Sequence, residues 1–313
     1  MVKLMKILTT AISSTANDGA YRLVNSGKTI GRIEIDELTA MVRDGTILDN
    51  YTYGTQIVIP YTDPSNNVTY DLPFNFGTVR EFEREDGSTF TGLGLFAEYG
   101  VPVCGIQYDN VEPTNTLTVR KQFGNCRYIH SSVRQWLNKS GVEWYEAQHE
   151  YDAAPTTPDP ATIKCFPDCL PKEFVDSCVE VKVLSYACKQ DSYSLDATYD
   201  KFFLLATSEI NSRMSDGRYG LTSDAEGAYW EYWRYVSGAT DYWSSTVYGS
   251  NGLNDNVYRT RYTVEDHTAN CEWFLRSVRT PDAYLPITVR KRGSVSPVNA
   301  SEIRRVVPAC VIG

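Results

Sequence analysis

Cysteine and histidine are the residues of this sequence best suited to chemistry, so their spacing is considered first. Cys165 and Cys169 are four residues apart, and Cys178 and Cys188 follow in the same stretch. Thiolates bind zinc in closed sets of four ligands, with paired cysteines at short, fixed spacings. The spacing here fits neither a zinc ribbon nor a zinc knuckle. We therefore expect no metal site, and we interpret most cysteines as reduced core thiols, with one disulfide as the alternative.

The three histidines, His130, His149 and His267, stand apart from any serine or cysteine nucleophile motif. The sequence contains no G-x-S-x-G, H-E-x-x-H or P-loop motif, although the members of a catalytic triad converge only in space. We therefore expect no catalytic residues, no enzyme activity and no cofactor.

Composition argues against two classes of partner. The formal net charge of −9 is the opposite of the dense lysine and arginine footprint that a phosphate backbone requires. No apolar stretch approaches the length of a membrane span, and the apolar part of residues 1–18 is too short and too interrupted for a secretory signal. We expect neither nucleic-acid binding nor membrane insertion. The 22 tyrosines, many in polar surroundings, are instead typical of adaptable recognition surfaces.

The first half of the chain is predicted to contain one short helix followed by strands. A short amphipathic helix ending at Gly45 is predicted from apolar residues at helical spacing, namely Ile33, Ile35, Leu38, Met41 and Val42. From Tyr51 the alternating pattern predicts hairpin-rich β structure, with a turn at Asp86 and Gly87.

Two helices and a buried strand are predicted in the middle of the chain. In residues 131–138 (SSVRQWLN) a serine can cap a helix whose apolar residues share one face. A second helix is predicted in residues 170–182, and residues 200–210 read as a buried strand running into a helix start. The end of the chain, residues 271–312, is strand-like.

The aromatic residues divide between core and surface. Tyr229 and Trp233 share helical spacing with apolar neighbours, and we assign them to packing. Trp243 and the stretch of residues 248–262 are rich in polar neighbours and are predicted to lie at the surface. In the segment EWFLRSV, we expect Trp273 and Leu275 to face the core and Arg276 to join a structural hydrogen-bond network.

Five segments in this order resemble a family of C-type-lectin-like domains of phages and gut bacteria, formally of unknown function and related to the variable proteins of diversity-generating retroelements. The segments that carry the resemblance are SSVRQWLN (Ser131–Asn138), LPKEFVDSCVEVKV (Leu170–Val183), DKFFLLATSEI (Asp200–Ile210), EWFLRSV (Glu272–Val278) and RRVVPACVI (Arg304–Ile312). Each motif alone is weak, but their common order makes the resemblance specific.

The resemblance implies an α+β, C-type-lectin-like fold: a small twisted antiparallel sheet, two flanking helices and a long irregular region that presents the ligand surface. Residues 1–45 would be a short N-terminal accessory segment, and residues 46–313 the lectin-like domain, with residues 46–125 as its β-rich leading part.

Two departures from related proteins limit the chemistry. Calcium-dependent lectins use Glu-Pro-Asn or Gln-Pro-Asp motifs followed by Trp-Asn-Asp, and neither motif is present, so we expect no lectin-type calcium site. Formylglycine-generating enzymes share this broad fold and need two closely placed reactive cysteines. Here Cys271 and Cys310 lie on different segments, which makes such an enzyme the least favoured alternative.

The resemblance places varied positions between the EWFLRSV strand and the final strand, and the polar aromatic tract adds further candidates. The predicted ligand-binding residues are Trp243, Tyr248, Asn251, Asn254, Asn256, Tyr258, Arg279, Thr280, Asp282, Ala283, Tyr284, Ser294, Ser296, Asn299 and Ser301.

The predicted function is non-enzymatic binding of a host-surface protein or glycan by a phage-encoded, possibly retroelement-diversified protein on the virion tail or capsid surface. A homo-oligomer is expected, because several weak sites gain avidity when presented together. The alternatives are a structural virion protein, such as a capsid or tail decoration, and, for location, a soluble bacterial protein without a signal peptide.

Overall fold

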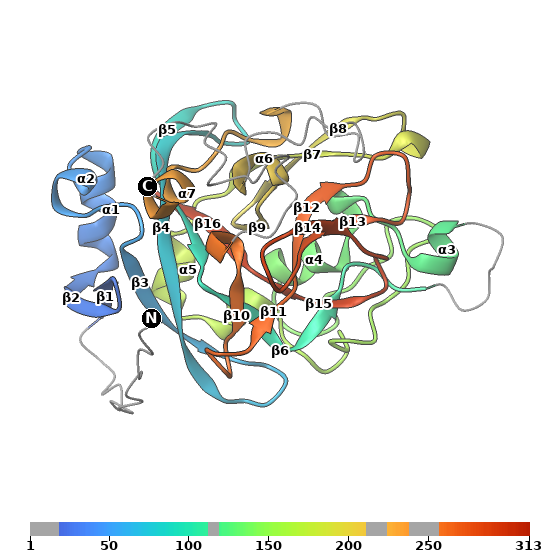
Figure 1. The fold of residues 1–313 in the computed structure, drawn as a ribbon, viewed down its shortest axis with the longest axis horizontal. Helices are drawn as coiled ribbons and strands as arrows, with labels where there is room; N and C mark the ends of the chain where they lie inside the picture. The colour runs from blue at the N-terminus through green and yellow to red at the C-terminus, as the bar shows by residue number, and fades with distance from the viewer. Residues whose placement is uncertain (1–18, 112–118, 211–223, 238–256) are drawn as a thin grey trace, which may run out of the picture.

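A computed structural model describes residues 19–111, 119–210, 224–237 and 257–313. The described chain is a mixed α+β structure dominated by sheets (Figure 1), which confirms the predicted class at this level. Its strands form two seven-stranded sheets and a separate two-stranded hairpin. The sheets are thus more extensive than the small sheet that the resemblance implies, because strands from the first hundred residues pair with strands from the C-terminus.

The first sheet joins the two ends of the chain. In spatial order its strands are β2 (Lys28–Glu34), β1 (Ala20–Asn25), β3 (Gln56–Thr62), β4 (Thr69–Glu83), β5 (Thr89–Ala97), β16 (Pro308–Ile312) and β9 (Phe202–Leu204). The predicted turn between β4 and β5 is confirmed: Ser88 N donates to Asp86 Oδ1 at 2.9 Å, and Gly87 has φ +79°.

The second sheet is built mainly from the C-terminal segments that were predicted to be strands. Its order is β11 (Asn270–Cys271), β10 (Arg261–Thr263), β6 (Tyr99–Gln107), β15 (Ile303–Val306), β12 (Trp273–Val278), β13 (Pro286–Val289) and β14 (Val295–Pro297). The pairs β10–β6 and β12–β15 are parallel, and the other pairs are antiparallel. The remaining hairpin consists of β7 (Val181–Tyr186) and β8 (Leu195–Asp200).

The helices are short, and the predicted one in SSVRQWLN is confirmed as α4 (Ser132–Asn138). Ser131 caps it, since its Oγ accepts from Arg134 N at 3.1 Å. The second predicted helix is α5 (Lys172–Ser177), which is shorter than expected because the chain enters β7 at Val181. The other helical segments are α1 (Ile35–Arg43), α2 (Ile47–Asn50), α3 (Val119–Phe123), α6 (Thr207–Ile210), α7 (Glu231–Ser237), η1 (Tyr128–His130), η2 (Phe166–Cys169), η3 (Lys189–Asp191), η4 (Asp224–Glu226) and η5 (Val257–Arg259).

The N-terminal segment differs from its prediction. The helix α1 exists, but Ile33 is a buried residue of β2 and not part of the helix, because the β1–β2 hairpin continues to Glu34. Gly45 follows the helix with φ +73°, a backbone conformation that favours glycine. Strand β1 also pairs with β3, so the first sheet runs across the predicted boundary at residue 45.

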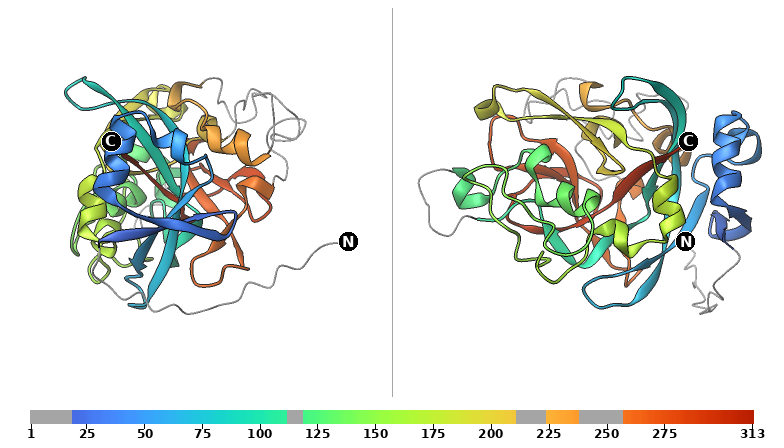
Figure 2. Two further views of the ribbon diagram at one scale, coloured as in Figure 1. Left: turned by 90° about the vertical axis from the view of Figure 1, so that its left-hand side faces the viewer. Right: turned by 180° about the vertical axis from the view of Figure 1, so that it is seen from behind.

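The core is aromatic, and the predicted packing residues are confirmed within it. Tyr229 and Trp233 are 3% and 1% exposed, and Trp273 and Leu275 are fully buried. Phe96 stacks on Trp233 at a ring distance of 5.2 Å, which joins α7 to β5. The second view of Figure 2 shows α1 at one end of the molecule, next to the sheet that contains the C-terminal strand. Across the described part of the chain, no helix is both long and apolar enough to cross a membrane.

Candidate functional site

Three separate segments meet at the end of the molecule opposite α1: helix α3, the β7–β8 turn with η3, and the loop of residues 279–284 (Figure 1). Arg120 Nε on α3 donates to Ala283 O at 3.4 Å, and Lys189 N donates to Thr280 O at 2.6 Å. Two backbone carbonyls of the loop therefore accept hydrogen bonds, one from α3 and one from η3.

Ion pairs stabilise this end. Arg120 pairs with Asp191. Arg127 donates two hydrogen bonds to Asp196, from Nε to Oδ2 and from Nη2 to Oδ1, each 2.7 Å long. Its Nη1 also lies 3.9 Å from Asp191 Oδ1. Two parallel bonds to one carboxylate strengthen the ion pair and also fix its geometry. Against an opposing effect of burial, the hydrogen bond from Arg120 holds the pKa of Asp191 below its usual value.

Two thiols lie beneath these ion pairs. The Cys126 thiol hydrogen-bonds to Cys188, which, together with the charge of Arg120 and against an opposing effect of burial, lowers the pKa of Cys188 to about 7. Arg120 Nη2 donates to Cys188 Sγ at 3.2 Å. Both sulfurs are enclosed, with each residue 0% exposed. A thiolate without access to solvent is a poor nucleophile, so this sulfur serves as an acceptor that orients Arg120. We call Arg120, Cys126, Arg127, Cys188, Asp191 and Asp196 the end cluster.

A second polar group is enclosed in the interior and confirms the predicted network around Arg276. Its Nε donates to Leu184 O at 2.8 Å, and its Nη1 donates to Leu204 O and to Glu209 Oε2, both at 2.6 Å. Its Nη2 donates to Glu226 O. The side chains of Arg276 and Glu209 are only 2% and 3% exposed. One guanidinium thus fastens β12 to β7, to the end of β9, and to the segments that carry the two carboxylates.

The carboxylates of this network have further donors. Ala206 N donates to Glu209 Oε2 at 2.8 Å, and Tyr186 N donates to Glu226 Oε1 at 3.0 Å. Ser277 Oγ donates to Glu226 Oε2 at 2.5 Å. Burial raises the pKa of Glu226 although Arg276 opposes that shift. We call Arg276, Glu209, Glu226 and Ser277 the arginine hub.

The structure brings together two of the predicted ligand-binding segments. Arg279 Nε and Asp282 Oδ2 form an ion pair at 3.3 Å. Ala300 N donates to Tyr284 O at 2.9 Å, so the loop that ends at Tyr284 lies against the turn of residues 299–301. The residues Arg279, Asp282, Tyr284, Asn299 and Ser301 are all partly exposed. They therefore lie on two adjoining loops beside the end cluster.

Two predicted contacts in these segments are corrected by burial. Thr280 is 4% exposed and Ala283 is 1% exposed, and Ala283 packs against Cys126 and Cys188. The resemblance placed the varied positions in this interval, but the loop turns inward at residues 280 and 283. Both side chains pack inside the loop and are almost closed to solvent.

Phe123 belongs to the same surface, although it was not among the predicted residues. Its ring pairs with that of Tyr284 at 4.9 Å, and its carbonyl accepts from Ser301 N at 2.9 Å. No residue of α3 is buried. No helix was predicted over residues 119–123, so no local sequence pattern pointed to this ring.

The other predicted residues lie apart or outside the described residues. Tyr258 is in η5, and its carbonyl accepts from Arg261 Nη1 at 3.2 Å, beside the aromatic core. Ser294 and Ser296 are on the β13–β14 hairpin and are partly buried. The predictions that fall outside the described residues are Trp243, Tyr248, Asn251, Asn254 and Asn256.

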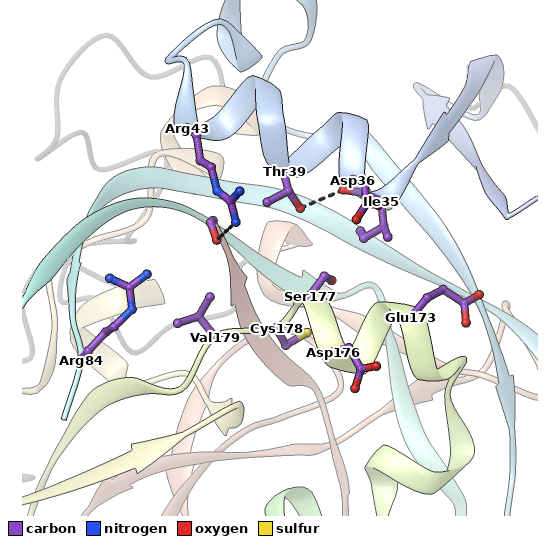
Figure 3. Close-up of a pocket in the computed structure, with 11 residues that line it drawn as sticks. Ile35, Asp36, Thr39, Arg43, Arg84, Glu173, Asp176, Ser177, Cys178 and Val179 are labelled. Carbon is purple, nitrogen blue, oxygen red and sulfur yellow. Dashed lines mark hydrogen bonds between the residues drawn. The ribbon is translucent and has the colours of Figure 1, made fainter. Parts of the chain in front are cut away.

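A cleft of about 700 Å³ lies at the other end, between α1 and α5 (Figure 3). Its cations are engaged within the protein: Arg43 Nη2 donates to Gly313 O at 3.4 Å, and the Arg84 guanidinium lies 3.9 Å above the Phe90 ring. Its acid Glu173 accepts from Tyr21 OH at 2.8 Å. Two polar groups of this cleft, Arg43 and Glu173, are thus used where the N-terminal segment packs against the rest of the chain.

The cysteines of the enzyme alternative do not share a site. Cys271 is in β11 of the second sheet, and Cys310 is in β16 of the first sheet. Cys310 lies beside Cys178, since their thiols share a hydrogen bond. All eight cysteines fall in described residues; none forms a disulfide, and seven are buried.

One comparison with known proteins gives a match. A family model described as Domain of unknown function (DUF6273) matches residues 104–313. No curated protein and no solved structure matches the chain. The matched range holds the arginine hub, the end cluster and the exposed loops, whereas the strand β5 that pairs with its last strand lies upstream of it.

Proposed function

For this chain, which belongs to the DUF6273 family, we propose a non-enzymatic binding role in which one end of the molecule contacts a protein or glycan of a host surface. The contact surface consists of Arg279, Asp282, Tyr284, Asn299 and Ser301, with Phe123 added. The observation that carries the proposal is the hydrogen bond from Ala300 N to Tyr284 O, which joins two loops that are separate in sequence.

The chemistry of this surface suits recognition. It combines two partly exposed aromatic rings with an ion pair, an amide and a hydroxyl. Aromatic rings give a large contact area at low entropic cost, and short polar side chains adapt their hydrogen bonds to different partners. The same combination stacks on sugar rings or packs against protein side chains.

Rigid support favours binding. The loop behind Arg279 rests on Cys126 and Cys188 and is bonded to Arg120 and Lys189. A loop that is already ordered loses less conformational entropy when a ligand binds. The end cluster would therefore contribute to affinity without touching the ligand.

The finer proposal is a C-type-lectin-like fold. It is supported by the pairing of the last strand β16 with β5 and β9, by the flanking helices α4 and α5, and by irregular loops gathered at one end. With this fold we propose a phage-encoded protein of the virion surface, assembled as a homo-oligomer, whose C-terminal loops are diversified by a retroelement.

Binding to intact bacterial cells tests the role. Labelled protein is applied to a panel of bacterial strains, with and without protease or periodate treatment of the cells, to separate protein from glycan receptors. We expect strain-specific binding that the double variant Arg279→Ala/Tyr284→Ala loses. The matched control Lys28→Ala/Ile30→Ala changes exposed residues of β2 at the other end and should bind normally. Equal binding by both variants would refute the assigned surface, and binding to no strain would favour a structural virion role.

The DNA around the gene tests diversification separately. We expect a reverse-transcriptase gene and a near-copy of the codons for about the last third of the chain, differing at adenines. Their absence would contradict diversification and favour a binder of fixed specificity or a structural virion protein.

A further inference from the structure

Outside the surface described above, three side chains with metal-binding atoms gather at one place. They are His130 at the end of η1, and His149 and Asp152 in the turn that follows Gln148. Their ligand atoms all lie within 4.8 Å of one another. We propose that His130, His149 and Asp152 bind one divalent transition-metal cation of the zinc type. This inference goes beyond the proposed binding role and does not depend on it.

His130 supplies the strongest reason. Its Nδ1 is shielded from solvent and has no hydrogen-bond partner. A buried polar atom without a partner costs about 1–3 kcal/mol, so such atoms in a folded protein need an explanation. The hydroxyl of Tyr145 is also buried without a hydrogen-bond partner. The charges of Asp109 and Asp152 act on this hydroxyl. A cation bound to His130 Nδ1 would give this atom the partner that it lacks.

The two histidines of the proposed site are in direct contact. The two imidazole rings lie 4.0 Å apart, tilted by 33°.

Asp152 is oriented from behind. Asn125 Nδ2 donates to its Oδ1 at 3.0 Å, while the backbone N–H groups of Gln148 and His149 donate to Oδ2 at 3.1 and 2.8 Å. Metal-ligating carboxylates are held by such outer hydrogen bonds. Burial raises the pKa of Asp152 against the opposing effect of these hydrogen bonds. His149 Nδ1, 3.9 Å from Oδ2, is too far to supply a hydrogen bond.

A simpler interpretation is that Asp152 only closes the turn of residues 148–152 and that the histidines only stack. It explains the backbone bonds of Asp152, but it leaves His130 Nδ1 without a partner. Two imidazoles and one carboxylate match the three protein ligands of an open zinc site. The His149 side chain is 38% exposed, so the fourth position would face water. The small rotation that brings His149 into place is open to an exposed side chain.

The consequence of binding would be local. Tyr151 lies in the same turn, with its ring under the Arg120 guanidinium at 4.8 Å. A cation bound to His130 would fix this turn against η1, and through Tyr151 it would steady the end cluster.

Cobalt(II) is the probe, because its tetrahedral complexes have intense visible bands and thiolate ligands add a distinct charge-transfer band. The full chain with Cys104→Ser is used, which removes the exposed thiol. We expect about one cobalt ion per chain with the nitrogen–oxygen spectrum, displaced by zinc. Changing a ligand to alanine in His149→Ala should weaken binding at least ~10-fold. The matched control is His267→Ala, since His267 is also exposed but stacks on Tyr99 at 4.1 Å.

A second variant guards against misfolding. Asp152→Asn keeps an oxygen for the backbone N–H groups of the turn but removes the charge, and it should also weaken cobalt binding while unfolding cooperatively like the parent. The proposal is overturned if no tetrahedral spectrum develops, if the spectrum shows thiolate ligation, or if His149→Ala binds cobalt as tightly as His267→Ala.

Discussion

The arginine hub and the end cluster use the same chemistry in different surroundings. In the hub, Arg276 and Glu209 are 2% and 3% exposed, and the guanidinium is bonded to three backbone carbonyls as well as to the carboxylate. In the end cluster, Arg127 and Asp196 are 21% and 9% exposed and mainly bond each other. Enclosed Arg276 thus joins its segments through backbone carbonyls as well as a carboxylate, whereas the partly exposed Arg127 is held mainly by the carboxylate of Asp196.

The largest expected effect is removal of the hub's cation. Arg276→Met removes the cation beside the buried carboxylate of Glu226 and leaves Glu209 only its ion pair with Arg80 at 3.5 Å, so the free energy of unfolding should fall by about 3–5 kcal/mol. Urea unfolding measures it. The control is Arg22→Met, whose pair with Asp71 is exposed and contributes at most about 1 kcal/mol. Similar losses in the two variants would break the comparison between enclosed and exposed pairs.

The next largest effect on stability is expected where the core beside the hub is closely packed. At Gly77 an added Cβ would lie 2.2 Å from Trp230 Cε3, whereas at Gly31 it would meet nothing within 4 Å. Gly77→Ala should therefore lower the unfolding free energy by about 1–3 kcal/mol, because an overpacked core must shift. Gly31→Ala should leave it unchanged or slightly raised. Thermal unfolding of the two variants compares them, and a neutral Gly77→Ala would mean that the Trp230 ring moves freely.

The stability that His130 contributes should depend on pH. His130 has a folded pKa of about 4, below the ordinary value of 6.5, so the unfolded chain binds more protons between these values. The contribution of His130 to stability is thus complete above pH 6.5 and lost as the pH falls toward 4. After a discount for partial exposure, the loss is about 1–2 kcal/mol.

The measurement is urea unfolding between pH 7 and pH 4 with a chelator present, for the parent and His130→Gln. The parent should lose stability relative to His130→Gln as the pH falls. His267→Gln should follow the parent. A constant difference between the parent and His130→Gln across this window would contradict the assignment of the effect to His130.

The smallest effect on stability is expected at the proposed contact surface. The pair of Arg279 and Asp282 is 39% and 28% exposed, so Arg279→Ala should change the unfolding free energy by less than about 0.5 kcal/mol. Chemical denaturation checks this value beside the cell-binding assay. A loss above about 1 kcal/mol would show that Arg279 belongs to the scaffold, and the contact surface would have to be redrawn.

Local signals in the sequence were sufficient for several elements. The serine before α4, the Asp86-Gly87 turn and the helical spacing around Trp233 each act within a few residues, and each prediction was confirmed. The hairpin of β1 and β2 was missed because Ile33 fits a helical and an alternating pattern equally well. Pairing of β1 with β3 decided between the two.

The sequence by itself determined the capped helix α4, the Asp86-Gly87 turn and the C-terminal strands, because caps, turns and hydrophobic periodicity depend on near neighbours. The α+β class was expected from the resemblance, and the partners of Arg276 lie far away in the chain. Only the tertiary structure decided that Tyr284 meets Ala300, that Thr280 and Ala283 turn inward, and that His130 meets Asp152. Those contacts depend on strand register and on the packing of segments far apart in the chain, and no local pattern records them.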